Sequence, residues 1–77
     1  MLGERLKKLR KYHGFTANRI AKALNISERA YRFYEAGSRN PPFDILVKLS
    51  EIYDTSIDYL VTGSDWRGSL SVFSDED

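Results

Sequence analysis

The sequence predicts an all-α fold, a compact bundle of five short helices, and three observations favour this class. No stretch alternates apolar and polar residues for long enough to form a half-buried strand. Apolar residues instead recur at helical spacing in five short segments. Residues that end helices or form turns separate these segments, namely Gly14, Asn25, Gly37, Pro41, Pro42 and Gly63. A chain of 77 residues can bury one core but not two, so we expect a single domain.

The first two helices are predicted from an apolar stripe and from a capping residue. Leu2, Leu6 and Leu9 lie at i, i+4 and i+7, so the first helix is amphipathic and ends near Tyr12. Thr16 can cap the second helix by accepting a hydrogen bond from an amide of its first turn. The inner face of the second helix is formed by Ala17, Ile20, Ala21 and Leu24.

A third helix is predicted over residues 28–36, after a turn of only three residues. Ser27 can cap its start, and Ile26 and Tyr31 have the spacing of a hydrophobic staple. Gly37 can provide a left-handed stop at its end. Because the turn before it is so short, the second and third helices must cross steeply.

The fourth and fifth helices follow the proline pair. The prolines can open a helix that runs from about Phe43 to Tyr53. Ser56 can cap a short fifth helix, which stops at Gly63. The residues of the fourth helix available for the core are Ile45, Leu46, Leu49, Ile52 and Tyr53.

Residues 1–63 therefore form the predicted domain, and residues 64–77 form an acidic tail. The tail is rich in serine, glycine and aspartate, so we expect it to be partly mobile. Its apolar residues could dock on the domain or on a partner; they are Trp66, Leu70, Val72 and Phe73.

Charge is distributed unevenly along the chain, although the formal net charge is only +1. Residues 1–40 hold ten basic and three acidic side chains, whereas residues 41–77 hold two basic and eight acidic ones. The positive part suits a polyanion such as nucleic acid, which would repel the negative part. Both parts could also be solvated surfaces, so charge alone does not decide the function.

Several classes of function are not favoured. The chain has no cysteine and a single histidine, His13, so it offers neither a disulfide framework nor a thiolate or imidazole metal site. It carries no glycine-rich phosphate loop and no catalytic Ser, His and Asp set, so we expect no enzyme, no cofactor and no small-molecule substrate. No apolar run approaches the ~20 residues that span a bilayer, and the N-terminus does not resemble a signal peptide. We therefore expect a soluble, cytoplasmic protein without a membrane partner.

The predicted third helix has two faces with different tasks. At roughly 100° per residue, the face that would anchor the helix carries Ala30, Tyr31 and Tyr34. The opposite face carries Arg29, Arg32, Phe33 and Ala36. An α-helix fits the major groove of DNA, where arginine can donate to guanine, a carboxylate can accept from cytosine, and an apolar side chain can contact a thymine methyl group. The candidates for these three contacts are, in that order, Arg29, Glu28 and Phe33.

Each candidate also has a structural explanation. Glu28 could merely complement the helix dipole, and Phe33 could lie against a second copy or against the tail. Arg29 and Arg32 could be solvated, and Arg32 suits phosphate better than a base. Other phosphate contacts are expected at the start of the second helix and in the loop after the third, from Thr16, Ala17, Asn18, Ser38, Arg39 and Asn40.

Arg10 and Glu35 are expected to form a structural ion pair between the first and third helices. Without such a partner, a carboxylate near the end of a DNA-facing helix would repel phosphate.

The order and spacing of the residues from Leu6 to Leu60 carry a resemblance to a known family. They include Leu6, Leu9, Arg10, Phe15, Thr16, Ile20, Ala21, Leu24, Asn25, Ile26, Ser27, Tyr31, Tyr34, Glu35, Ala36, Gly37, Pro41, Leu49, Ser56, Ile57, Asp58, Tyr59 and Leu60. In these residues the chain resembles the phage-repressor-like helix-turn-helix domains related to Cro and the lambdoid repressors, over about residues 2–63.

The resemblance implies a compact five-helix bundle, DNA binding by the third helix and frequent use as a transcriptional repressor, commonly as a dimer. It implies base-reading positions at Glu28, Arg29 and Phe33, and a recurrent ion pair at Arg10 and Glu35. The residue that opens the second helix is often glutamine in the family and contacts the DNA backbone. It is Ala17 here, so that side-chain contact is lost or passes to Asn18. Phe33 stands where a polar side chain is usual.

The leading hypothesis is a sequence-specific transcriptional regulator that binds double-stranded DNA as a homodimer on half-sites about 34 Å apart. The alternative is a protein-interaction role on the same fold, such as an antitoxin or adaptor whose tail engages a partner.

Overall fold

Hydroxyl side chains open three of the helices in the described part of the chain. Thr16 Oγ1 accepts from the Arg19 amide at 3.1 Å, and Ser27 Oγ accepts from the Ala30 amide at 3.0 Å. Ser56 caps its helix in the same way. Each bond satisfies one of the amides that a first helical turn leaves free. The three predicted caps are confirmed.

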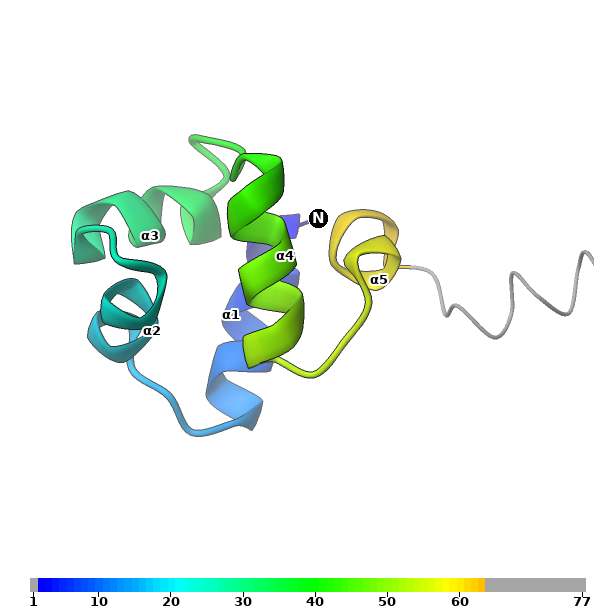
Figure 1. Cartoon of the computed structure of the whole chain (residues 1–77), viewed down its shortest axis with the longest axis horizontal. Helices are drawn as coiled ribbons and strands as arrows, with labels where there is room; N and C mark the ends of the chain where they lie inside the picture. The colour runs from blue at the N-terminus through cyan, green and yellow to red at the C-terminus, as the bar shows by residue number, and fades with distance from the viewer. Residues whose placement is uncertain (1, 64–77) are drawn as a thin grey trace, which may run out of the picture.

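Five helices form the described part of this computed structural model, residues 2–63, and no strand occurs within it. In chain order they are α1 (Leu2–Tyr12), α2 (Ala17–Leu24), α3 (Glu28–Ala36), α4 (Phe43–Ile52) and α5 (Ile57–Thr62). Figure 1 shows α4 in the middle of the view, with α2 and α3 on one side of it and α5 on the opposite side. The predicted all-α bundle is confirmed. The fourth helix ends one residue before the predicted end, because Tyr53 is its C-cap.

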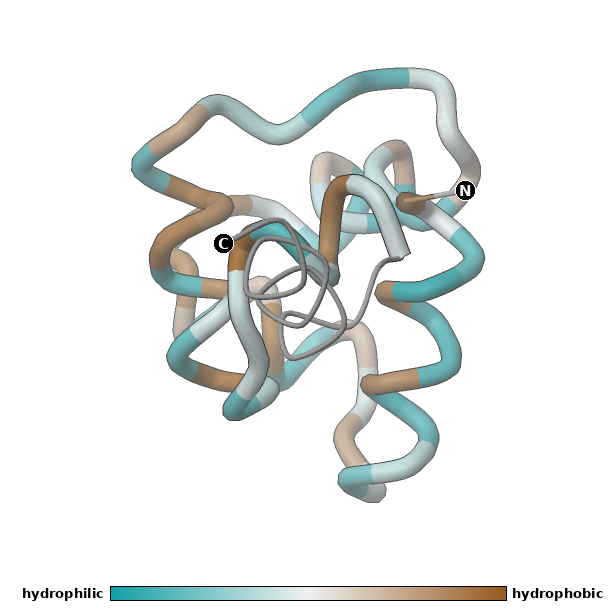
Figure 2. The backbone as a smooth tube through the Cα atoms, turned by 90° about the vertical axis from the view of Figure 1, so that its right-hand side faces the viewer, coloured by the Kyte–Doolittle hydropathy of each residue, from teal (hydrophilic) through white to brown (hydrophobic). Residues whose placement is uncertain are grey.

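One core of buried side chains lies between the helices. It contains Leu6, Ala17, Ile20, Ala21, Leu24, Tyr31, Ile45, Leu49, Tyr53 and Leu60. Figure 2 shows the apolar residues as short segments separated by hydrophilic ones along the chain, as amphipathic helices require. The whole predicted inner face of α2 is buried in this core. The expectation for Leu46 was wrong: it is only half-buried and lies outside the cluster.

Helix α1 lies close to α3 at Gly3, which is buried. A Cβ atom placed on Gly3 would meet the carbonyl oxygens of Glu35 and Tyr34, the latter at 2.8 Å. Both neighbours are backbone atoms near the end of α3, so neither can move aside as a flexible side chain would. Gly3 therefore allows α1 to contact the end of α3 directly.

Replacing Gly3 with alanine is expected to destabilise the domain by about 1–3 kcal/mol, the usual cost of overpacking. In a helix without such a neighbour, the same change would stabilise by about 1 kcal/mol. Urea denaturation measures the difference in the free energy of unfolding. Gly14→Ala is the control, because a Cβ atom there meets nothing within 4 Å. Any loss of stability in this variant comes from the left-handed backbone at position 14, where φ is 75°. A rise in stability for Gly3→Ala would contradict the close approach.

Within residues 2–63, none of the helices is long and apolar enough to cross a membrane. The predicted acidic tail, residues 64–77, lies outside the described residues, as do its candidate docking side chains.

Candidate nucleic-acid interface

The turn between α2 and α3 sets the direction of α3. Asn25 caps the end of α2 in the left-handed conformation, with φ 59°, and its amide donates to the carbonyls of Ala21 and Lys22. The Ile26 amide also donates to the Ala21 carbonyl, at 3.0 Å. Figure 1 shows α2 nearly end-on and α3 lengthwise, so the two helices cross steeply, as predicted.

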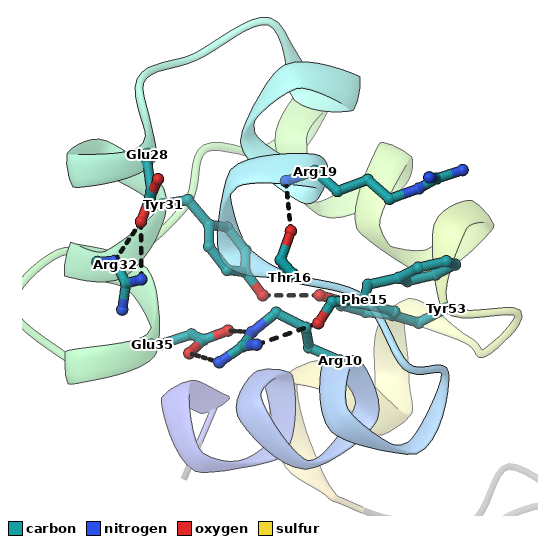
Figure 3. Close-up of polar contacts among 9 residues, drawn as sticks. All are labelled: Arg10, Phe15, Thr16, Arg19, Glu28, Tyr31, Arg32, Glu35 and Tyr53. Atoms are coloured by element: carbon teal, nitrogen blue, oxygen red, sulfur yellow. Dashed lines mark hydrogen bonds and ion pairs between the residues drawn. The ribbon is translucent and has the colours of Figure 1, made fainter.

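Two buried tyrosine hydroxyls and a partly buried ion pair hold the inner face of α3 in place. The hydroxyl of Tyr31 lies 2.7 Å from that of Tyr53, and both side chains are buried. Glu35 accepts from Arg10 through both oxygens, from Nε at 2.6 Å and from Nη2 at 3.1 Å. Arg10 also donates from Nη1 to the Phe15 carbonyl at 3.1 Å. Figure 3 shows these contacts linking α3 to α1 and to the segment after it, so α3 cannot slide or rotate without breaking them.

The protonation states of these groups follow from their surroundings. Burial raises the pKa of Tyr31, and it raises that of Tyr53 to about 12, so both hydroxyls stay protonated and one donates to the other. Burial alone would raise the pKa of Glu35 too. The hydrogen bond from Arg10, the nearby Tyr31 hydroxyl and the charge of Arg10 together outweigh burial, so this pKa lies below its ordinary value. The pair is therefore charged at neutral pH, with side chains only 13% and 9% exposed.

The outer face of α3 presents a phenylalanine flanked by two arginines. Phe33 is half-buried but is not among the side chains packed on the core. The guanidinium carbon of Arg29 lies 5.5 Å from the centre of its ring, and that of Arg39 lies 4.9 Å from it. Arg29 and Arg39 are exposed, and neither belongs to the ion pairs found within residues 2–63. This face thus combines unpaired cations with an apolar surface.

Glu28 occupies the start of the same face and already has two partners. Its Oε1 accepts from Asn18 Nδ2 at 3.2 Å, and its Oε2 accepts from Arg32 Nε at 2.8 Å. The Arg32 bond, followed by the Asn18 bond, lowers the pKa of Glu28. The carboxylate therefore ties the first turn of α2 to α3 and directs Arg32 along the helix, as Figure 3 shows for the Arg32 contact.

The side chains predicted to contact phosphate differ in their availability. Thr16 uses its hydroxyl oxygen as the cap of α2. Ala17 is 3% exposed and belongs to the core, so only its backbone amide can meet a ligand. Asn18 is exposed beside Glu28. The loop after α3 also exposes its polar side chains, which are Ser38, Arg39 and Asn40.

Comparison with known proteins places this arrangement in a family. A family model described as Helix-turn-helix matches residues 6–60, which include all of α2, the turn and α3. The chain belongs to the helix-turn-helix family. Membership in this family confirms the resemblance predicted from the sequence. Helices α2 and α3 are the two helices of the helix-turn-helix motif.

Relatives of this helix-turn-helix chain are named as regulators. The uncharacterized HTH-type transcriptional regulator YqaE of Bacillus subtilis (strain 168) is 42% identical over 76 residues, covering 99% of this chain and 63% of YqaE. The HTH-type transcriptional regulator ImmR of the same organism is 43% identical over 60 residues, covering 78% of this chain and 47% of ImmR. The chain spans about half to two thirds of the length of these relatives. The names of these relatives agree with the class that the sequence predicts, a DNA-binding transcriptional regulator.

Two solved helix-turn-helix proteins share the fold. The P22 c2 repressor, in a crystal structure with synthetic operator 9T, has a TM-score of 0.79 and 28% sequence identity, covering 83% of this chain and 97% of the repressor. A transcriptional regulator from Listeria innocua has a TM-score of 0.76 and 28% identity, covering 99% of this chain and 76% of the regulator. The five-helix fold is thus that of the P22 c2 repressor.

Three features of residues 2–63 were not predicted from the sequence. Asn18 was assigned to phosphate but contacts Glu28, and Arg39 was assigned to phosphate but lies over Phe33. Phe43 received no role, although it is 71% exposed at the start of α4, close in sequence to the loop after α3. The first two contacts join separate elements, so helical spacing could not reveal them. The exposure of Phe43 has a signal in the sequence, because Phe43 is not among the predicted core residues of the fourth helix.

Proposed function

We propose that this domain binds double-stranded DNA in a sequence-specific manner with α3 in the major groove, and that it acts as a transcriptional repressor. The observation that carries the proposal is the division of α3 into a fixed inner face and an outer face on which Arg29 has no ion-pair partner among residues 2–63. Arg29 is exposed on that outer face, while Tyr31 and Glu35 on the inner face are held by Tyr53 and Arg10. A helix that is anchored on one face can present the other to base edges without losing its position.

Three side chains of α3 are proposed to read bases. Arg29 donates to guanine O6 and N7, and Phe33 contacts a thymine methyl group. Glu28 accepts from cytosine N4, because a carboxylate has about four lone-pair sites and its two partners here occupy only part of them.

Contacts to phosphate are proposed on both sides of α3. On one side lie the free amides at the start of α2, from Ala17 and Asn18, next to the capping Thr16. On the other side lie Arg32 and the exposed loop that carries Ser38, Arg39 and Asn40. Such contacts fix the orientation of the protein on DNA without selecting a sequence.

Residues 1–63 are proposed to be the DNA-binding unit, and two copies are proposed to bind one operator in the cytoplasm. The repressor bound to an operator among the similar structures supports the DNA-binding part of this proposal, as do relatives named transcriptional regulators. Half-sites that are one turn of the DNA helix apart place the α3 helices of the two copies about 34 Å from each other. Analytical ultracentrifugation of the complex should find two chains for each duplex. One chain for each duplex, at saturation, would contradict the homodimer.

Selection from a pool of randomised duplexes tests the proposed function. We expect a motif to be enriched, with affinity that falls steeply as the salt concentration rises. Arg39→Ala should weaken binding to all sequences alike and reduce the slope of log affinity against log salt by about 1. A pool that shows no enriched motif after repeated rounds would contradict sequence-specific binding.

A further inference from the structure

An open cleft of about 360 Å³ lies between α1 and α5, and we call it the Arg5 cleft. Its lining residues are Glu4, Arg5, Lys8, Tyr59, Thr62 and Gly63. The Arg5 guanidinium lies over the ring of Tyr59, with its central carbon 5.9 Å from the ring centre. None of these residues takes part in the proposed contacts to DNA.

Arg5 has a buried donor without an acceptor. Its Nη1 atom is buried, yet it has no hydrogen-bond partner among residues 2–63. Neither Arg5 nor Lys8 belongs to the ion pairs found in that part of the chain, although Glu4 lines the same cleft. An unsatisfied buried donor on a charged group is costly, so folded proteins normally supply an acceptor for it. We therefore expect Arg5 to bind a group from outside residues 2–63.

The charges of the cleft favour an anion as that group. Arg5 and Lys8 are three residues apart, so they are neighbours on α1 and repel each other. Even with Glu4 counted, one positive charge remains among the lining residues. A guanidinium binds a carboxylate well, because its N–H donors match the geometry of the two carboxylate oxygens.

The cleft faces away from the surface proposed to bind DNA. On α1, Gly3 and Arg10 contact α3, and at roughly 100° per residue they lie within about 20° of each other around the helix. Arg5 lies about 160° from Gly3, on the opposite side of α1. Figure 1 shows α5 on the opposite side of α4 from α3. The anion is therefore not a phosphate of the DNA that α3 would bind.

The chain itself passes the guanidinium where it leaves α5. Gly63 caps the end of α5 with φ 77°, and a Cβ atom placed on it would lie 2.7 Å from Arg5 Nη2. The next acidic residue in the sequence is Asp65. Consecutive Cα atoms are about 3.8 Å apart, so the Cα atoms of Gly63 and Asp65 cannot be more than about 7.6 Å apart. So short a connection gives the Asp65 carboxylate a high effective concentration at the cleft.

We propose that the Arg5 cleft is a carboxylate-binding site and that Asp65 of the same chain occupies it. The carboxylate accepts a hydrogen bond from the buried Nη1 of Arg5 and relieves the repulsion between Arg5 and Lys8. The contact holds the start of the acidic segment against α1, on the side of the domain away from α3. It does not require DNA, so it can be tested separately from the proposed function.

A double-mutant cycle on the full chain tests the contact. Urea denaturation at low salt compares the natural protein, Arg5→Met, Asp65→Asn and the double variant. Each single change should raise the equilibrium constant of unfolding. The double variant should raise it about fivefold less than the product of the two single effects, the value of one ordinary hydrogen bond. A double variant that equals this product would overturn the proposal.

Asp75→Asn is the matched control, because it removes the same charge twelve residues after Gly63 rather than two. Its cycle with Arg5→Met should show no coupling. Equal coupling in the two cycles would indicate a general attraction between the acidic segment and α1, and would overturn Asp65 as the occupant. The Asp65 cycle should give the same coupling at about tenfold higher protein concentration. A larger coupling there would assign the carboxylate to a second copy and overturn the contact within one chain.

Nuclear magnetic resonance provides a second readout that does not require Arg5→Met to fold. The side-chain guanidinium signals of Arg5 should shift in Asp65→Asn and should stay in place in Asp75→Asn. Signals that stay in place in both variants would mean that water satisfies Nη1, and would overturn the carboxylate site.

Discussion

Replacement of Arg29 by alanine is expected to lower affinity for the enriched duplex about 5- to 150-fold. The change removes a bidentate arginine–guanine contact, which is worth about 1–3 kcal/mol of discrimination. Arg29 is exposed and its guanidinium lies over the ring of Phe33 outside the core, so its loss should leave the fold unchanged. Fluorescence anisotropy at one fixed salt concentration, on the enriched duplex and on its single base-pair variants, measures the effect. The preference at one base pair should disappear.

Arg19→Ala provides the control for charge. It removes the same charge from α2, where the Arg19 guanidinium lies 5.6 Å from the ring centre of Phe15. Figure 3 shows this side chain pointing away from Glu28 and Arg32. The Arg19→Ala change should lower affinity modestly and equally for all duplexes. If Arg29→Ala also lowered affinity equally for all duplexes, Arg29 would be a phosphate contact and not a base reader.

Loss of the Arg10–Glu35 pair is expected to have the second large effect, a decrease in the stability of the domain. Arg10→Met should destabilise the domain by about 3 kcal/mol, because it leaves the Glu35 carboxylate, whose side chain is only 9% exposed, without its charged partner. It also removes the donor to the Phe15 carbonyl. The double variant Arg10→Met with Glu35→Leu should recover much of the loss, since no buried charge remains. Urea denaturation of the four proteins completes a double-mutant cycle. Additive losses would mean that the two side chains do not stabilise each other.

The same pair predicts how stability responds to acid. The pKa of Glu35 is lower in the folded protein than its ordinary value of 4.5, so the charged carboxylate stabilises the fold at neutral pH. That contribution is complete above about pH 5 and is lost as the pH falls through the folded pKa. Glu35→Gln should therefore lose less stability between pH 6 and pH 3 than the natural protein. Equal losses for the two proteins would contradict a lowered pKa.

Much of the fold could be predicted because its signals are local. Thr16 and Ser27 stand just before their helices and bond amides three residues later, a pattern that is visible in the sequence. The signals for the turn at Asn25 and for the apolar face of α2 are equally local. The helix-turn-helix motif and the steep crossing of α2 and α3 could therefore be predicted. Arg10 and Glu35 are 25 residues apart, and their pairing was proposed from the need to neutralise a carboxylate near DNA.

The remaining features depend on how helices pack. Gly3 looks like a poor helix residue until α1 and α3 are seen to touch there. Tyr31 and Tyr53 both have apolar spacing, and nothing in that spacing shows that their hydroxyls meet across 22 residues. The place of Arg39 over Phe33 depends on the path of a loop, which carries no periodicity. Leu46 lies at the helical spacing expected of core residues, but it is only half-buried and lies outside the core cluster.

The presence of α3 in the major groove can be measured most directly by nuclear magnetic resonance of the labelled domain bound to the enriched duplex. Intermolecular nuclear Overhauser effects should join the side chains of Arg29 and Phe33 to base protons of the major groove. The largest amide shifts should lie in residues 16–18, 27–33 and 38–40, with smaller ones in α5. Contacts to bases made only from α4 or α5, with the signals of residues 27–33 unchanged, would contradict the assignment of α3 as the reading helix.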